Sequence, residues 1–166
     1  VPSGGGAKEA VHSEWIPLRS VPMAAVRDTL AKKGSLIVAL PPNASVLEAA
    51  RVMSERSVGA VLVIDEGHLV GIFTERDILR RVVAEGRDPA KEPLATVVTR
   101  DVLTCTPATP LDECRALMTT RRLRHLPVVG PDGLCGVISS GDVLAFQVAE
   151  QQSEIQDLNR YVYDMR

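Results

Sequence analysis

The sequence predicts an α/β (α+β) fold made of two copies of one strand-helix-strand-strand-helix unit, followed by a long C-terminal helix. The pattern glycine, two apolar residues, hydroxyl residue, two variable residues and aspartate occurs at 71–77 and again at 136–142, 65 residues later. The same offset aligns residues 37–79 with the second half of the chain without a gap. A register kept over this length indicates a duplicated supersecondary unit.

Each copy begins with a short apolar run and an amphipathic helix. In the first copy, residues 36–40 (LIVAL) form the run, and Ser45 and Glu48 then make a capping box. Apolar residues follow within 46–53 at the three- and four-residue spacing of a helix face, and residues 111–118 keep that spacing in the second copy. We therefore expect a strand and then a helix in both copies.

The middle of each copy predicts a β-hairpin followed by a second helix. In the first copy, β-rich runs at 58–64 and 69–73 flank the turn sequence Asp-Glu-Gly, and the helix covers 75–85. In the second copy, runs at 123–129 and 134–138 flank Gly-Pro-Asp-Gly. The helix that follows continues from 140 to 164.

This long final helix carries apolar residues at three- and four-residue steps. One small module cannot cover such a stripe, so we expect it to pack against a second subunit, giving a homodimer, or against the N-terminal extension. The residues of the stripe are Leu144, Val148, Ile155, Leu158, Val162 and Met165.

The expected organisation has five parts. They are a partly flexible N-terminal extension (1–24), a first motif (25–86), a linker (87–101), a second motif (102–148) and a C-terminal helix extension (149–166).

Composition argues against several classes of function. The 166 residues are 45% hydrophobic with a net charge of −2, and no basic face indicates nucleic-acid binding. The apolar stretches are too interrupted to span a membrane, and no signal peptide is visible, so we expect a cytoplasmic protein. The sequence offers no nucleophile–base pair, metal cluster or Walker loop, and an enzyme is therefore not expected.

The three cysteines fall where the first copy has apolar residues. Cys105, Cys114 and Cys135 align with leucine, alanine and valine. This favours buried small hydrophobic side chains. Redox sensing through an exposed thiol remains an alternative.

The repeated motif has two interpretations. Thr74 with Asp77, and Ser139 with Asp142, have the spacing of a capping box at a strand-to-helix junction. The same junction also suits a ligand, because its glycine lets another group approach the backbone and its helix N-terminus attracts phosphate. An acid beside that terminus can accept hydrogen bonds from a ribose diol. With the apolar first strand as a slot for a base, the motif suits a nucleoside phosphate.

Two segments resemble the CBS motif, and in tandem they resemble a stand-alone CBS pair, also called a Bateman module. The segments are PPNASVLEAARVMSERSVGAVLVIDEGHLVGIFTERDIL and TPATPLDECRALMTTRRLRHLPVVGPDGLCGVISSGDVL. The resemblance implies two β-α-β-β-α motifs packed through their sheets about a pseudo-twofold axis. It further implies two clefts that bind adenosyl ligands, namely AMP, ADP or ATP, and sometimes NAD or S-adenosylmethionine.

The resemblance also implies the site residues. The family's aspartate holds the ribose, which maps to Asp77 and Asp142, and its hydroxyl residue lies near phosphate, which maps to Thr74 and Ser139. Residues of the first strands would line the base slot: Val38, Ala39, Leu103 and Thr104.

Basic residues of the middle strand often meet phosphate in this family, which maps to Arg124 and His125. The first copy has Gly-Ala there and offers Arg76 where the second copy has glycine. The two clefts should therefore differ in charge.

We expect a non-enzymatic sensor that binds an adenine nucleotide and signals to an effector protein in trans. The alternatives are a structural dimerisation module with empty clefts, a redox regulator and, least favoured, an enzyme.

Overall fold

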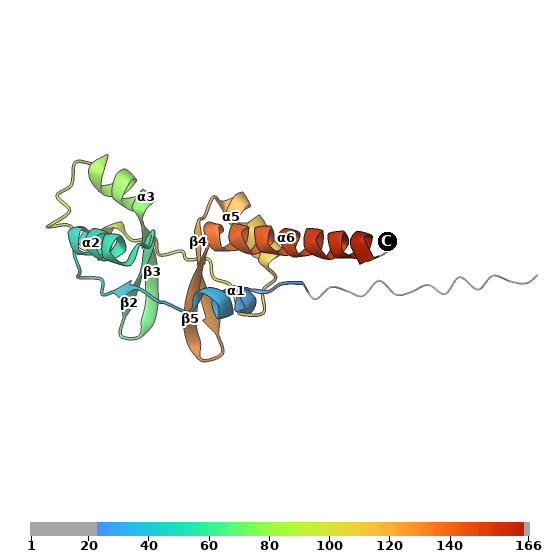
Figure 1. The fold of residues 1–166 in the computed structure, drawn as a ribbon. Helices are drawn as coiled ribbons and strands as arrows, with labels where there is room; N and C mark the ends of the chain where they lie inside the picture. The colour runs from blue at the N-terminus through green and yellow to red at the C-terminus, as the bar shows by residue number, and fades with distance from the viewer. Residues whose placement is uncertain (1–22, 165–166) are drawn as a thin grey trace, which may run out of the picture.

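The computed structural model describes residues 23–164, so most of the predicted N-terminal extension lies outside the described residues, as does Met165. Two units lie side by side as a pseudo-twofold pair (Figure 1). Their hairpins face the middle, the helices cover the outer sides, and α6 extends away from the pair. In this described part, no helix has the length and apolar character needed to cross a bilayer.

The first unit has the predicted order of elements. Its sheet runs β1-β2-β3, with β1 parallel to β2 and β2 antiparallel to β3. The predicted final helix is present, but it starts as a short α-helix and continues as a π-helix, η1. The elements are β1 (Ala39–Leu40), α2 (Val46–Arg56), β2 (Ala60–Asp65), β3 (His68–Thr74), α3 (Glu75–Asp77) and η1 (Ile78–Val83).

The second unit repeats this order with one strand missing. Its elements are α5 (Leu111–Arg121), β4 (His125–Gly130), β5 (Gly133–Ser139) and α6 (Ser140–Asp164). The long helix has the predicted bounds.

The expected first strand of the second unit is reduced to a single bridge between Cys105 and Val128. In the first unit, Leu62 N donates a hydrogen bond of 2.9 Å to Val38 O. The residue 65 positions after Leu62 is Pro127, which has no amide hydrogen to donate. The parallel ladder therefore cannot extend there as it does in the first unit.

A short helix, α4 (Leu94–Val97), lies within the segment expected to be a linker. Leu94 N donates to Ala44 O at 2.9 Å, and the Leu94 side chain is fully buried in the core of the first unit. The segment that leads to the second unit is therefore fixed on the first.

The N-terminal helix α1 (Val26–Lys33) makes the equivalent contact with the second unit. Val26 N donates to Thr109 O at 2.9 Å, and Val26 is fully buried in the core of that unit. Thus α1, which precedes the first unit, packs on the second, and α4, which precedes the second unit, packs on the first. Cys105 and Cys114 belong to the core of the second unit, as predicted for small hydrophobic side chains.

The glycines of the repeated motif serve this packing, which corrects the expectation that they admit a ligand. A Cβ on Gly71 would lie 2.4 Å from Val98 Cγ2 and 2.5 Å from Thr99 O. A Cβ on Gly136 would lie 2.8 Å from Leu30 Cδ2. The groups that approach the backbone at these positions belong to the segments of α4 and α1.

We predict that Gly71→Ala destabilises the fold more than Gly136→Ala. Thr99 O is held by its hydrogen bond from Ile72 N, so the backbone there cannot give way, and overpacking of this kind costs about 1–3 kcal/mol. At Gly136 the neighbour is the flexible end of the Leu30 side chain, which can move. Urea unfolding of the two variants measures the difference, and an equal loss of stability would contradict this account.

Candidate functional site

The strand-to-helix corner of the first unit is a closed capping box. Thr74 N and Oγ1 each donate to Asp77 Oδ2 at 2.9 Å, and Asp77 N donates to Thr74 Oγ1 at 3.4 Å. Arg81 Nε lies 3.5 Å from Asp77 Oδ1. The capping interpretation is therefore correct for this corner, and both carboxylate oxygens have partners.

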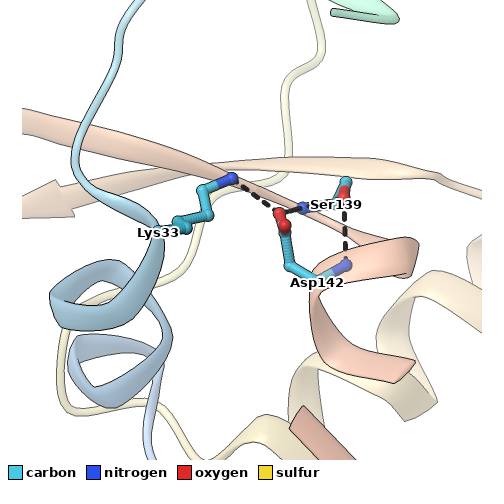
Figure 2. A network of polar contacts seen from close by, with 3 residues as sticks. All are labelled: Lys33, Ser139 and Asp142. Carbon is cyan, nitrogen blue, oxygen red and sulfur yellow. Dashed lines mark hydrogen bonds and ion pairs between the residues drawn. The ribbon is translucent and has the colours of Figure 1, made fainter. Parts of the chain in front are cut away.

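The second corner has the same box and one additional partner. Ser139 N and Oγ donate to Asp142 Oδ2 at 2.7 and 2.9 Å, and Asp142 N donates to Ser139 Oγ at 3.2 Å. Lys33 Nζ reaches the same oxygen from α1 at 2.6 Å (Figure 2). Among the described residues, none donates a hydrogen bond to Asp142 Oδ1.

The Asp142 carboxylate is ionised at neutral pH. Its burial would raise the pKa, but hydrogen bonds from Lys33 and Ser139 outweigh burial and hold the pKa below its ordinary value. The carboxylate therefore carries a negative charge, which the Lys33 ammonium partly offsets.

A cavity of about 130 Å³ joins the Asp77 corner to the second unit. Thr74, Arg76 and Asp77 line one side, and residues 122–125 line the other. Arg76 Nη1 donates to Arg122 O at 3.0 Å, so this arginine ties the two units together across the cavity.

A cavity of about 220 Å³ joins the Asp142 corner to the first unit. Its apolar wall includes Val38 and residues 58–60, and its polar wall includes Ser139, Asp142 and Lys33. The cavity therefore combines an apolar slot with an ionised carboxylate and a cation.

A third cavity, of about 660 Å³, adjoins both of the others. It shares Gly59 and His125 with each of them, and it adds the first residues of α6, Ser140 and Gly141. Arg124 also lines it. A basic side chain and a helix N-terminus therefore face one space, an arrangement that attracts anions.

His125 lies at the junction of the three cavities. A Cβ on Gly59 would lie 3.3 Å from His125 Cε1, so the ring occupies space that the first unit leaves open. Its Nδ1 is buried without a hydrogen-bond partner in the described residues. Burial, and then the charge of Arg124, lower the pKa of His125 despite the opposing charges of Glu75 and Asp142. The imidazole is therefore neutral at neutral pH.

The structure brings together most of the residues expected to form the site. Thr74, Arg76 and Asp77 share a cavity with Arg124 and His125, while Val38, Ser139 and Asp142 share another with His125. The remaining three lie outside the lining of these cavities: Ala39, Leu103 and Thr104. Ala39 follows Val38 in an extended segment, and successive side chains of such a segment point to opposite faces.

Sequence reasoning missed several lining residues, of which Lys33 has the clearest chemistry. Lys33 lies 109 positions from Asp142 and before the start of the aligned repeat, so no local spacing connects the two. The only sequence signal was the pair of lysines at 32–33. The others missed include Leu36, Ser57, Glu75, Arg122 and Leu123.

Within residues 23–164, no three histidine, cysteine, aspartate or glutamate side chains come together as potential metal ligands.

Comparison with known proteins agrees with this geometry. The CBS domain model matches residues 36–84 and 94–149. The mitochondrial CBS domain-containing protein CBSX3 of Arabidopsis thaliana is 37% identical over 123 residues, which are 71% of this chain and 60% of that protein. The chain thus spans about three fifths of the length of that relative.

Solved structures show the same arrangement of two units. A CBS-domain protein from Burkholderia ambifaria MC40-6 superposes with a TM-score of 0.75 and 37% identity, covering 77% of this chain and 96% of that one. The CBS domain pair of protein MJ0100, solved with 5′-methylthioadenosine and S-adenosyl-L-methionine, has a TM-score of 0.69 and 26% identity, covering 78% and 99%. This chain therefore belongs to the CBS-domain family, as a tandem pair of CBS motifs.

Proposed function

We propose that this chain is a non-enzymatic regulatory module that binds an adenosine-containing ligand between its two CBS motifs. The observation that carries the proposal is the pairing of each aspartate corner with the opposite unit across a cavity. A ligand held there touches both units at once. The adenosyl ligands of the MJ0100 pair support the class of ligand.

The Asp142 cavity fits the nucleoside part of such a ligand. Val38, Val58 and Ala60 offer apolar surface to a flat base. Asp142 Oδ1 can accept a hydrogen bond from a ribose hydroxyl while Oδ2 keeps its capping bonds. Ligand binding and helix capping are therefore compatible at this corner.

The large cavity fits phosphate groups. Arg124 supplies a fixed positive charge, and Ser140 and Gly141 begin a helix of 25 residues whose positive dipole end attracts anions. Of its first amides, Ser140 N is bonded to Arg124 O and Asp142 N to Ser139 Oγ. The charge and the dipole favour AMP, ADP or ATP, and NAD is compatible with the same groups.

A ligand in this position can regulate by changing the relative placement of the units. It does so only to the extent that it binds one arrangement better than another. Because α1 and α4 each hold one unit against the other, a shift between the units displaces both helices. We propose that an effector protein reads this shift in trans.

Thiol chemistry is a weaker candidate for the regulated group. Cys105 and Cys114 are 6% and 1% exposed, so an oxidant in solvent has little access to either sulfur. Cys105 Sγ also faces Pro127 O. The hydrogen bond with Cys114 raises the pKa of the Cys105 thiol most, and burial raises it further. These features favour a structural role for Cys105 and Cys114, whereas Cys135 is partly buried.

We predict that AMP, ADP, ATP or NAD raises the melting temperature and that Asp142→Asn weakens this effect. The amide can still cap the helix, but it loses the charge, and a hydrogen bond to a charged group is worth about 10- to 100-fold in affinity. Thermal shift followed by isothermal titration calorimetry measures both effects, since a ligand of the native state must stabilise it.

Asp77→Asn is the matched variant in the other cleft. A loss confined to one variant assigns the ligand to that cleft. If none of the adenosyl ligands, including S-adenosylmethionine, binds at millimolar concentration, the proposed function is wrong and the duplicated fold serves another purpose.

We further propose a homodimer formed through the C-terminal half of α6. Ile155, Leu158 and Val162 are each more than half exposed and lie at steps of three and four residues. With Leu144 and Val148 they form the seam of a coiled coil. A second copy of the same helix offers a complementary stripe.

We predict that Leu158→Lys shifts the protein from dimer to monomer without unfolding it. Leu158 is 67% exposed, so a charge is tolerated in the monomer but not in an apolar seam. Gln156→Lys, which adds the same charge beside the seam, should leave the dimer intact. Sedimentation equilibrium gives the mass of each variant, and a wild-type monomer would contradict the proposal.

A further inference from the structure

Lys33 gives the Asp142 cleft a cation that comes from a docked helix, whereas the cation paired with Asp77 is Arg81 of the same unit. Lys33 ends α1, and its Nζ lies 2.6 Å from Asp142 Oδ2 (Figure 2). The two side chains are 34% and 23% exposed, so this ion pair is partly shielded from solvent. It joins distant segments of the chain, because α1 precedes the first unit but packs on the second, to which Asp142 belongs.

Among the described residues, the position equivalent to Lys33 holds no cation beside the Asp77 cleft. The 65-residue offset places Val98 at the position of Lys33, and Val98 packs against Gly71. If α1 and α4 are instead aligned by their docking bonds, Val26 N to Thr109 O and Leu94 N to Ala44 O, then Asp101 occupies the position of Lys33. Asp77 is paired within its own unit, with Arg81 four residues further along. The asymmetry therefore comes from the sequence as well as from the geometry.

We propose that Lys33 determines the ligand preference of the Asp142 cleft and selects phosphorylated adenosyl ligands over uncharged or cationic ones. This inference rests on the proposed function and names the ligand class for one of the two clefts.

The physical basis is the fate of the Lys33 ammonium when a nucleoside enters. A ribose hydroxyl that donates to Asp142 Oδ1 draws on the same carboxylate charge that Lys33 Nζ binds at Oδ2. The ion pair is thereby weakened, and a neutral nucleoside supplies no further negative charge to the ammonium. A phosphate in the adjoining cavity supplies one, and charge-assisted hydrogen bonds to phosphate are roughly twice as strong as neutral ones. The neighbouring cation Arg124 and the neutral His125 do not compensate for a weakened ion pair.

The effect of a cationic ligand follows from the same charges. The two cations of the lining, Lys33 and Arg124, are already matched by two carboxylates, Asp142 and Glu75, so a sulfonium group finds no unpaired negative charge there. Unlike a phosphate, it also cannot bind the Lys33 ammonium. Of the adenosyl ligands, S-adenosylmethionine should therefore be the least favoured here.

The test compares AMP with adenosine in an Asp77→Asn background, so that only the Asp142 cleft reports. Isothermal titration calorimetry gives the two dissociation constants. We expect AMP to bind more tightly, and Lys33→Ala and Lys33→Gln to reduce the AMP-to-adenosine preference by about tenfold, the value of a hydrogen bond to a charged group. Part of the change should appear as tighter binding of adenosine, because Asp142 is then released.

Lys32→Ala is the matched control. It removes the same charge from the same helix, but the Lys32 ammonium lies 4.4 Å above the ring of Phe146 and not at Asp142. If Lys32→Ala reduces the preference as much as Lys33→Ala, or if neither Lys33 variant changes it, the inference is overturned while adenosyl binding stands. If neither ligand binds the unsubstituted protein or the Asp77→Asn variant, both the proposed function and this inference fall.

Discussion

The rest of the structure depends on the exchange of the two short helices α1 and α4. Each of them precedes one unit in the chain but packs on the other. Neither unit has a complete core by itself, because Leu94 completes the first and Val26 completes the second. Burial of each side chain contributes about 1.5–3 kcal/mol, and a chain that separated the units would lose this contribution. The exchange therefore fixes the distance between the units and, with it, the clefts between them. It also sets the position of Lys33.

The aspartate corners show why capping and ligand binding need not be rival interpretations. In both corners the hydroxyl residue and its backbone amide use the same oxygen, Oδ2. The other oxygen is left for a separate partner, which is Arg81 at Asp77 and none of the described residues at Asp142. A carboxylate already held by its cap is also oriented in advance, so a ligand does not have to pay the entropy of fixing it.

The sequence predicts what depends on local pattern and fails where a contact spans the chain. The hairpins, α2, α5 and the full length of α6 follow from periodicity, turns and capping residues. The docked helices α1 and α4 could not be predicted, because only their contacts with distant units stabilise segments this short. The role given to Gly71 was wrong for the same reason, since Val98 and Thr99 approach it from beyond the motif. The register of the repeat, by contrast, did contain the explanation for the missing strand at Pro127.

Duplication gives two equal corners, and the differences between the units arise where one copy changed and the other did not. Gly59 has no side chain, and the His125 ring lies against it. These two residues, which differ between the copies, together form a wall that borders all three cavities. Divergence at one pair of positions thus gives a duplicated scaffold one wall common to two corner cavities whose other linings differ.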